Sequence, residues 1–285
     1  MRGAILSACV ALLFLLSSSA LLLAAPAIEL TPESPRPGDV ILITLRAEEP
    51  LLRAACSWGG RSYRFLETEE SYGLALPVAL TTEPGAHHAT VYWKYAAGGM
   101  GRATIPVRVA RREFGVQHLR LSANQERQYS APETERERRL IGAALDIVSP
   151  QRHWHGPFIR PLEGRTSTEF GLQRHINGRL AYRHRGVDIA APEGTPVRSA
   201  AGGVVSLADD SFLLHGQTVI IDHGQGVSTL YLHLSQLDVS PGEIVSQGQV
   251  VGRVGSTGVA TGPHLHFAAY AYHEPVDPFF LTELE

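Results

Sequence analysis

Hydrophobic and polar positions alternate with a period of two over several short stretches of this chain, a pattern that predicts β-strands. Two such stretches in the first half are 40–45 and 104–109, and three in the second half are 218–221, 227–232 and 264–270. Proline and glycine separate them, as expected for turns between short strands. The sequence therefore predicts a mainly β fold.

Residues 1–27 have a different pattern. Arg2 is followed by a long apolar stretch that ends in small residues, among them Ala25 and Ala27. This order is typical of a secretory signal peptide cleaved after Ala27, and it predicts export to the periplasm or cell envelope without a stable membrane span after cleavage. An uncleaved membrane anchor is the alternative, because the apolar stretch approaches the roughly 20 residues that span a bilayer.

Changes in composition divide the remaining chain into three parts. Residues 28–110 predict a small, immunoglobulin-like β-sandwich, in which Pro106 places the last strand at a sheet edge. Residues 111–150 combine a charged run with an apolar run and predict a helical connector. Residues 151–285 are rich in glycine and histidine and predict an antiparallel β domain.

Charge and cysteine content exclude several classes of protein. The formal net charge of −3, with 44% hydrophobic residues, argues against disorder and provides no basic surface for nucleic acid. Removal of the signal leaves Cys56 alone, so an exported chain would have no internal disulfide. We expect Cys56 to be a buried, unpaired thiol and the fold to depend on its core or on a metal.

Histidines gather in the last part of the chain, where ten of the 13 lie. His264 and His266 are two residues apart in a predicted strand, which places both imidazoles on one face. His184 and Asp188 are four residues apart; fully extended, this segment would span about 13 Å, so a turn at Gly186 is needed to bring both groups to one cation. His233 lies in another apolar strand.

Each of these signals is weak alone, because a single histidine in a strand is usually structural or exposed. Two imidazoles and one carboxylate that leave a position open for water are, however, the ligand set of a hydrolytic zinc site. A helical His-Glu-x-x-His motif does not occur in the sequence, which excludes a thermolysin-like arrangement. His153 and His155 imitate a ligand pair, but we interpret them as loop or groove residues.

Three longer strings carry a family resemblance. They are FGLQRHINGRLAYRHRGVDIAAPEGTPVRSAAGGVV (170–205), VIIDHGQGVSTLYLHLS (219–235) and GEIVSQGQVVGRVGSTGVATGPHLHF (242–267). Together they closely resemble the lysostaphin and LytM-like zinc metallopeptidases, the beta-lytic family of peptidoglycan endopeptidases. The resemblance continues to 276–278 and implies the family's antiparallel β peptidase fold for 151–285.

The resemblance also implies roles for particular residues. His184, Asp188 and His266 match the positions that bind one zinc ion per chain, and His233 and His264 match the two catalytic imidazoles. His223 matches a position that shapes a turn beside the sheet. Arg174 and Asn177 match a segment before the ligands, and we assign neither a catalytic role.

The implied function is a secreted or periplasmic zinc metalloendopeptidase that hydrolyses peptide cross-links of peptidoglycan during cell-wall remodelling. The order of a β domain, a helical connector and a peptidase domain favours a DD-endopeptidase acting on D-Ala-diaminopimelate bonds. The alternatives are a noncatalytic envelope protein that docks peptidoglycan or activates another wall hydrolase, and a metal-dependent hydrolase of another substrate. We also expect peptidoglycan peptide as the substrate and an envelope protein as a partner in regulation.

Overall fold

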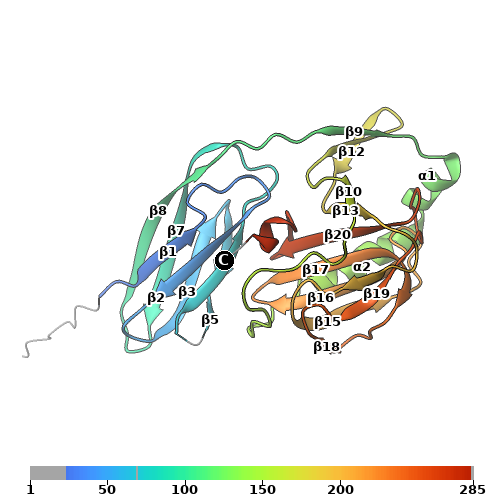
Figure 1. The fold of residues 1–285 in the computed structure, drawn as a ribbon. Helices are drawn as coiled ribbons and strands as arrows, with labels where there is room; N and C mark the ends of the chain where they lie inside the picture. The colour runs from blue at the N-terminus through green and yellow to red at the C-terminus, as the bar shows by residue number, and fades with distance from the viewer. Residues whose placement is uncertain (1–23, 69, 284–285) are drawn as a thin grey trace, which may run out of the picture.

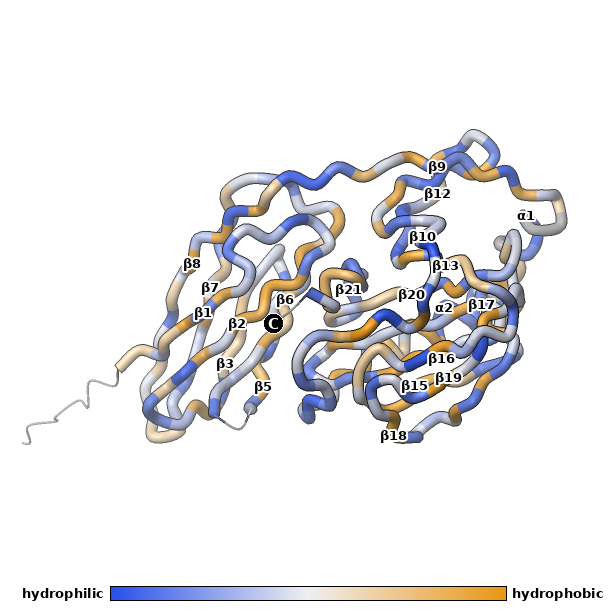
Figure 2. The backbone as a smooth tube through the Cα atoms, viewed as in Figure 1, coloured by the Kyte–Doolittle hydropathy of each residue, from blue (hydrophilic) through white to orange (hydrophobic). Residues whose placement is uncertain are grey.

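The structure is a computed structural model that describes residues 24–68 and 70–283, so most of the predicted signal peptide lies outside the described residues. It is mainly β, as the hydrophobic pattern predicts, with one β region on each side of the molecule (Figure 1). Hydrophobic positions follow the strands of both regions (Figure 2). Among the described residues, no helix has the length and apolar character that crossing a bilayer requires.

The N-terminal region is a sandwich of two four-stranded sheets. The first has the order β1-β2-β6-β5, formed by Ala27–Thr31, Val40–Arg46, Tyr72–Pro77 and Leu66–Glu67. The second has the order β4-β3-β7-β8, formed by Arg61–Arg64, Leu51–Trp58, Gly85–Tyr95 and Met100–Val109. Strand β8 is at a sheet edge, which confirms the expectation from Pro106.

A hydrophobic core lies between these two sheets. Strand β2 contributes Ile41, Ile43 and Leu45 at alternate positions, each at most 1% exposed. Cys56 is free and fully buried in the same core, as expected. Burial raises the pKa of its thiol to about 12, so this thiol is un-ionised at neutral pH.

The connector contains more than the predicted helices. Helices α1 (Ala123–Ser130) and α2 (Pro132–Leu145) are present, but strand β9 (Val116–Leu119) precedes them and pairs in parallel with β11. A short strand of this kind forms because a distant strand offers its edge, and local sequence carries little signal for it. In Figure 1 the connector crosses the top of the view from β8 to β9 and then descends through α1 to α2.

The C-terminal region is built on a ten-stranded sheet with the main order β10-β13-β20-β17-β16-β15-β18. These strands are Arg165–Thr168, Val187–Ala190, His264–Ala271, Val227–Leu237, Gln217–Gly224, Gly203–Asp209 and Ile244–Val245. Off this main order, β19 (Val250–Val254) pairs with β17 and with β14 (Pro196–Arg198), and β21 (Glu274–Val276) pairs with β20. A separate three-stranded sheet joins β9 to β11 (Gln173–Ile176) and β12 (Arg179–Arg183), and a short 3-10 helix (Phe280–Thr282) follows β21.

Several polar contacts and an aromatic contact join the sandwich and the connector to the C-terminal sheet. Arg112 of the connector forms ion pairs with Asp39 of the sandwich and with Asp277, which directly follows β21. Tyr63 of the sandwich meets Tyr272 edge-on, with ring centroids 5.4 Å apart. The sandwich therefore packs against the β20–β21 end of the sheet.

Candidate active site

Strand β20 presents two imidazoles to one side of the sheet. His264 and His266 are partly exposed, whereas Leu265 and Phe267 between and after them are at most 1% exposed and belong to the core. This alternation confirms that both histidines share a face, as their spacing predicts.

His184 and Asp188 meet through a bend at Gly186, as expected from their separation. Asp188 lies in β13, directly opposite His266 in the antiparallel pair β13–β20. Gly186 is needed for a further reason: a Cβ atom here would lie 2.4 Å from the backbone oxygen of Phe267 and 2.9 Å from the His266 ring. The absence of a side chain lets the bend approach β20 closely.

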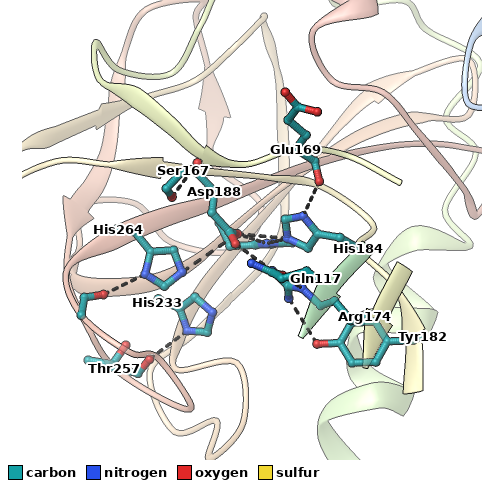
Figure 3. A network of polar contacts seen from close by, with 12 residues as sticks. Gln117, Ser167, Glu169, Arg174, Tyr182, His184, Asp188, His233, Thr257 and His264 are labelled. Atoms are coloured by element: carbon teal, nitrogen blue, oxygen red, sulfur yellow. Dashed lines mark hydrogen bonds and ion pairs between the residues drawn. The ribbon is translucent and has the colours of Figure 1, made fainter. Parts of the chain in front are cut away.

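Three donor atoms converge as a result (Figure 3). Oδ1 of Asp188 lies 3.0 Å from Nε2 of His184 and 2.8 Å from Nδ1 of His266, and these two nitrogens are 3.0 Å apart. Donors that share one zinc ion about 2 Å away are separated by roughly 3.3 Å in a tetrahedral site. The observed spacing is therefore close to that of a shared cation.

The protonation of His184 also favours a cation here. Its Nδ1 lies 2.8 Å from the backbone oxygen of Glu169, which can only accept, so Nδ1 carries the proton. In a neutral ring, Nε2 is then an unprotonated acceptor that faces the carboxylate of Asp188. Two acceptors at this distance need a positive charge between them. Together with His266 they make the nitrogen and oxygen donor set that zinc prefers.

The charge state of Asp188 suits a metal ligand. Burial opposes ionisation of this carboxyl group, but its close contacts with the His184 and His266 rings outweigh burial and hold its pKa well below the usual range. Burial lowers the pKa of His266 to about 4. At neutral pH the site therefore offers a carboxylate and an uncharged imidazole.

Two more imidazoles face this donor set. Nδ1 of His233 donates to the backbone oxygen of Thr257 (2.9 Å), and Nδ1 of His264 donates to that of Gly262 (2.8 Å). In each neutral ring the proton is thus fixed on Nδ1, and Nε2 is left as an acceptor. Burial, with smaller contributions from His266 and His264, lowers the pKa of His233 to about 3.

His233 reaches the site through an irregularity in β17. Leu230, Leu232 and His233 all line the same cavity, although adjacent residues of a regular strand face opposite sides. The register with β16 shifts in this part of the strand, and His233 adopts a φ of 62°. A left-handed conformation is uncommon for a residue other than glycine and often marks a functional site.

A cavity of about 450 Å³ is lined by all five of these site residues, which are His184, Asp188, His233, His264 and His266. Its lining residues all lie between Gln117 and His266, so the described N-terminal sandwich does not enter it. The connector supplies part of the wall, with Gln117, Leu119 and Leu121 before α1 and Arg138 and Ile141 on α2. The sequence interpretation missed this wall, because the connector's charged run resembles a solvated helix face.

The other histidines and the segment before the ligands have separate environments. His223, on β16, is fully buried and donates from Nδ1 to the backbone oxygen of Gly202. His175 contacts His118 of β9 with the rings tilted and their centroids 5.0 Å apart. Asn177 bonds the backbone of Leu121 on the connector. His215 lines the cavity.

This fold and donor set define a metallopeptidase domain. Residues 182–278 match peptidase family M23, and this part of the chain is a LytM-like peptidase M23 domain. A solved structure from Pseudomonas aeruginosa that is assigned to peptidase M23 is 28% identical, with a TM-score of 0.63; the match covers 88% of this chain and 96% of that one.

Two curated relatives match part of this chain. The DD-carboxypeptidase/endopeptidase Mpg of Neisseria meningitidis is 45% identical over 114 residues, and the peptidoglycan DD-endopeptidase ShyA of Vibrio cholerae is 40% identical over 114 residues. Each match covers 40% of this chain and 26% of the relative. The chain thus spans about a quarter of the length of these relatives.

Proposed function

We propose that this protein is a zinc-dependent endopeptidase that hydrolyses peptide cross-links of peptidoglycan. The observation that carries the proposal is the convergence of His184, Asp188 and His266 on one point, with the acceptor nitrogens of His233 and His264 facing the same cavity. This arrangement combines three ligands for a metal with two groups able to transfer protons.

The roles of the residues follow from their geometry. His184, Asp188 and His266 would hold one zinc ion, which when bound supplies Lewis acidity to the scissile carbonyl and lowers the pKa of water. Nε2 of His233 and of His264 is available to accept a proton from the attacking water and to return it to the leaving amine. The backbone oxygens of Thr257 and Gly262 fix both rings in this tautomer.

The relatives' names support the choice of substrate. ShyA is named as a peptidoglycan DD-endopeptidase and Mpg as a DD-carboxypeptidase/endopeptidase. Arg138 and Arg185 also line the cavity, and their positive charge suits a peptide with free carboxylates. We therefore assign the D-Ala-diaminopimelate cross-link as the bond cleaved, and the periplasm or cell envelope as the location.

Zinc content and muropeptide digestion test this proposal on one sample. The purified chain 28–285 is expected to hold one zinc ion and to convert dimeric, cross-linked muropeptides to monomers, with loss of activity in a chelator and recovery on adding zinc. Zinc without cleavage of these dimers would refute the assigned substrate, and an unrelated protein assayed in parallel would reveal a general protease. Lack of zinc together with muropeptide binding would favour the noncatalytic docking protein.

A further inference from the structure

Helix α2 of the connector carries a buried carboxylate that the proposed chemistry does not use. The side chain of Glu137 is 2% exposed. Its oxygens accept hydrogen bonds from the backbone N–H groups of Leu213, Leu214 (3.1 Å) and His215 (3.3 Å), and from Nδ1 of the His215 ring (2.8 Å). A buried charge is tolerated when this many donors surround it. Glu137 therefore fixes the loop 213–215.

This loop contacts the backbone of His233. The backbone oxygen of His215 accepts a hydrogen bond from the N–H of His233 at 3.1 Å. His233 is the residue with the left-handed conformation. The neighbouring oxygen of Leu214 accepts the N–H of Val259 at 2.9 Å. Val259 lies two residues after Thr257, whose backbone oxygen holds the His233 ring. The loop thus borders both contacts that orient His233.

Two glycines leave these segments little freedom to shift. A Cβ on Gly216 would lie 2.3 Å from Oγ1 of Thr257, and a Cβ on Gly258 would lie 2.5 Å from the backbone nitrogen of Gly216. Because the loop and the segment 257–259 pack too closely to admit even a Cβ atom at either glycine, a displacement of one segment moves the other. Strained backbone persists only where its surroundings hold it. The surroundings of His233 include the loop that Glu137 anchors.

Docking of α2 alone does not account for a carboxylate at this position. Ile141, Ala144 and Leu145 of the same helix already pack in a hydrophobic cluster with Phe212 and Leu230 of the peptidase region. An apolar residue at 137 would leave the N–H groups of the loop without an acceptor. The carboxylate therefore stabilises the loop 213–215, through hydrogen bonds, more directly than it stabilises the docking of the helix.

From these contacts we propose that Glu137 is a positioning residue for His233, so that the connector helix is part of the active site. The inference rests on the proposed function, because it assumes that His233 transfers protons. Glu137 lies outside the 182–278 segment that matches the family, and it acts through the loop 213–215 without contact with substrate.

Steady-state kinetics on dimeric muropeptides test this role with Glu137→Gln and the matched control Glu133→Gln, since Glu133 is exposed on the same helix. We expect Glu137→Gln to lower kcat about 10- to 100-fold with KM within about twofold, because small misplacements of a catalytic group have effects of this size. Zinc content and the control's kinetics should remain at wild-type values. An unchanged kcat, or a rise in KM alone, would overturn the role.

Nuclear magnetic resonance provides a readout that needs no activity. The Nδ1–H proton of His233, bonded to Thr257, should shift in zinc-loaded Glu137→Gln and stay unchanged in Glu133→Gln. An unchanged signal in both variants would exclude positioning even if the wild-type enzyme proved inactive on muropeptides, which would separately refute the proposed function.

Hydrogen exchange on the unaltered protein covers the case in which Glu137→Gln fails to fold. The amides of Leu213, Leu214 and His215 should then exchange as slowly as those of the central strands, because a buried carboxylate holds them. Rapid exchange at these three amides would show that Glu137 does not fix the loop and would overturn the inference.

Discussion

Arg174 donates from Nη2 to Oδ2 of Asp188 over 2.9 Å, and Oδ2 is the carboxylate oxygen that does not face the two histidines. Gln117 of the connector and Tyr182 of β12 hold the same guanidinium, through its Nε at 2.8 Å and its Nη1 at 3.3 Å. Arg174 thus orients the carboxylate through Oδ2, and Oδ1 remains available to the donor set with His184 and His266. The sequence placed Arg174 near the ligands, and the structure gives it a specific partner.

Replacement of Arg174 by methionine should weaken zinc binding. Groups that orient a metal ligand typically affect metal affinity about 10- to 100-fold, and we expect a loss in that range. Competition with a chromophoric chelator measures the affinity. Arg179→Met, an exposed arginine on β12, is the control and should bind zinc as the wild type does. Equal affinities for both variants would contradict the orienting role.

Alanine substitutions should divide the five site residues into two groups. His184→Ala, Asp188→Ala and His266→Ala should lose both zinc and activity, because each removes a donor atom. His233→Ala and His264→Ala should keep zinc and lose turnover by about 100-fold or more, as expected for a proton-transfer group. Elemental analysis and muropeptide digestion on the same preparations separate the groups. A zinc-loaded His184→Ala or a fully active His233→Ala would each remove that residue from its role.

The packing of the N-terminal sandwich against the C-terminal sheet should depend on the ion pairs of Arg112. Arg112→Met leaves the carboxylates of Asp39, 2% exposed, and Asp277 without this cation, and we expect the free energy of unfolding to fall by about 2 to 3 kcal/mol. Arg111→Met is the control, because its pair with Glu113 is exposed and should contribute less than about 1 kcal/mol. Urea unfolding measures both. Similar decreases in the free energy of unfolding for the two variants would show that Arg112 does not stabilise the contact between the two β regions.

Acid should destabilise the protein partly through His223, which lies away from the metal site. Burial lowers its pKa to about 4, whereas the unfolded chain titrates near 6.5. Between these values the unfolded state binds a proton and the folded state does not, so stability falls as the pH falls from 6.5 toward 4. At pH 5 this loss amounts to about 2 kcal/mol.

The contribution of His223 can be isolated by comparison with His223→Gln. The variant should lose less stability than the wild type between pH 7 and pH 5, even if it is less stable at pH 7. Urea unfolding in the presence of a chelator measures both proteins without a contribution from metal release. Equal losses in the two proteins would show that His223 does not titrate as proposed.

The sequence predicts most of what local spacing controls. The two histidines of β20 share a face because a strand alternates its side chains, and His184 and Asp188 need only a bend at Gly186 to meet. The sandwich and the C-terminal sheet also follow from alternating runs. These features depend on residues that are close together in the chain.

Features that depend on distant contacts were not predictable in this way. His233 faces the cavity through an irregularity in β17, and nothing in its apolar strand signals a left-handed residue. Strand β9 forms only beside β11, and Glu137 becomes buried only because the loop 213–215 surrounds it. A glutamate in a charged run is normally solvated, so nothing in the local pattern distinguishes Glu137 from its neighbours.

The parallel pairing of β9 with β11 has a consequence for shorter forms of the protein. A fragment that begins after the connector would retain the five site residues but leave the backbone hydrogen-bonding groups on that side of β11 uncovered. Open strand edges recruit strands from other molecules. Such a fragment should self-associate through this edge and bury one wall of its own cleft, whereas the longer chain covers the edge with its own residues.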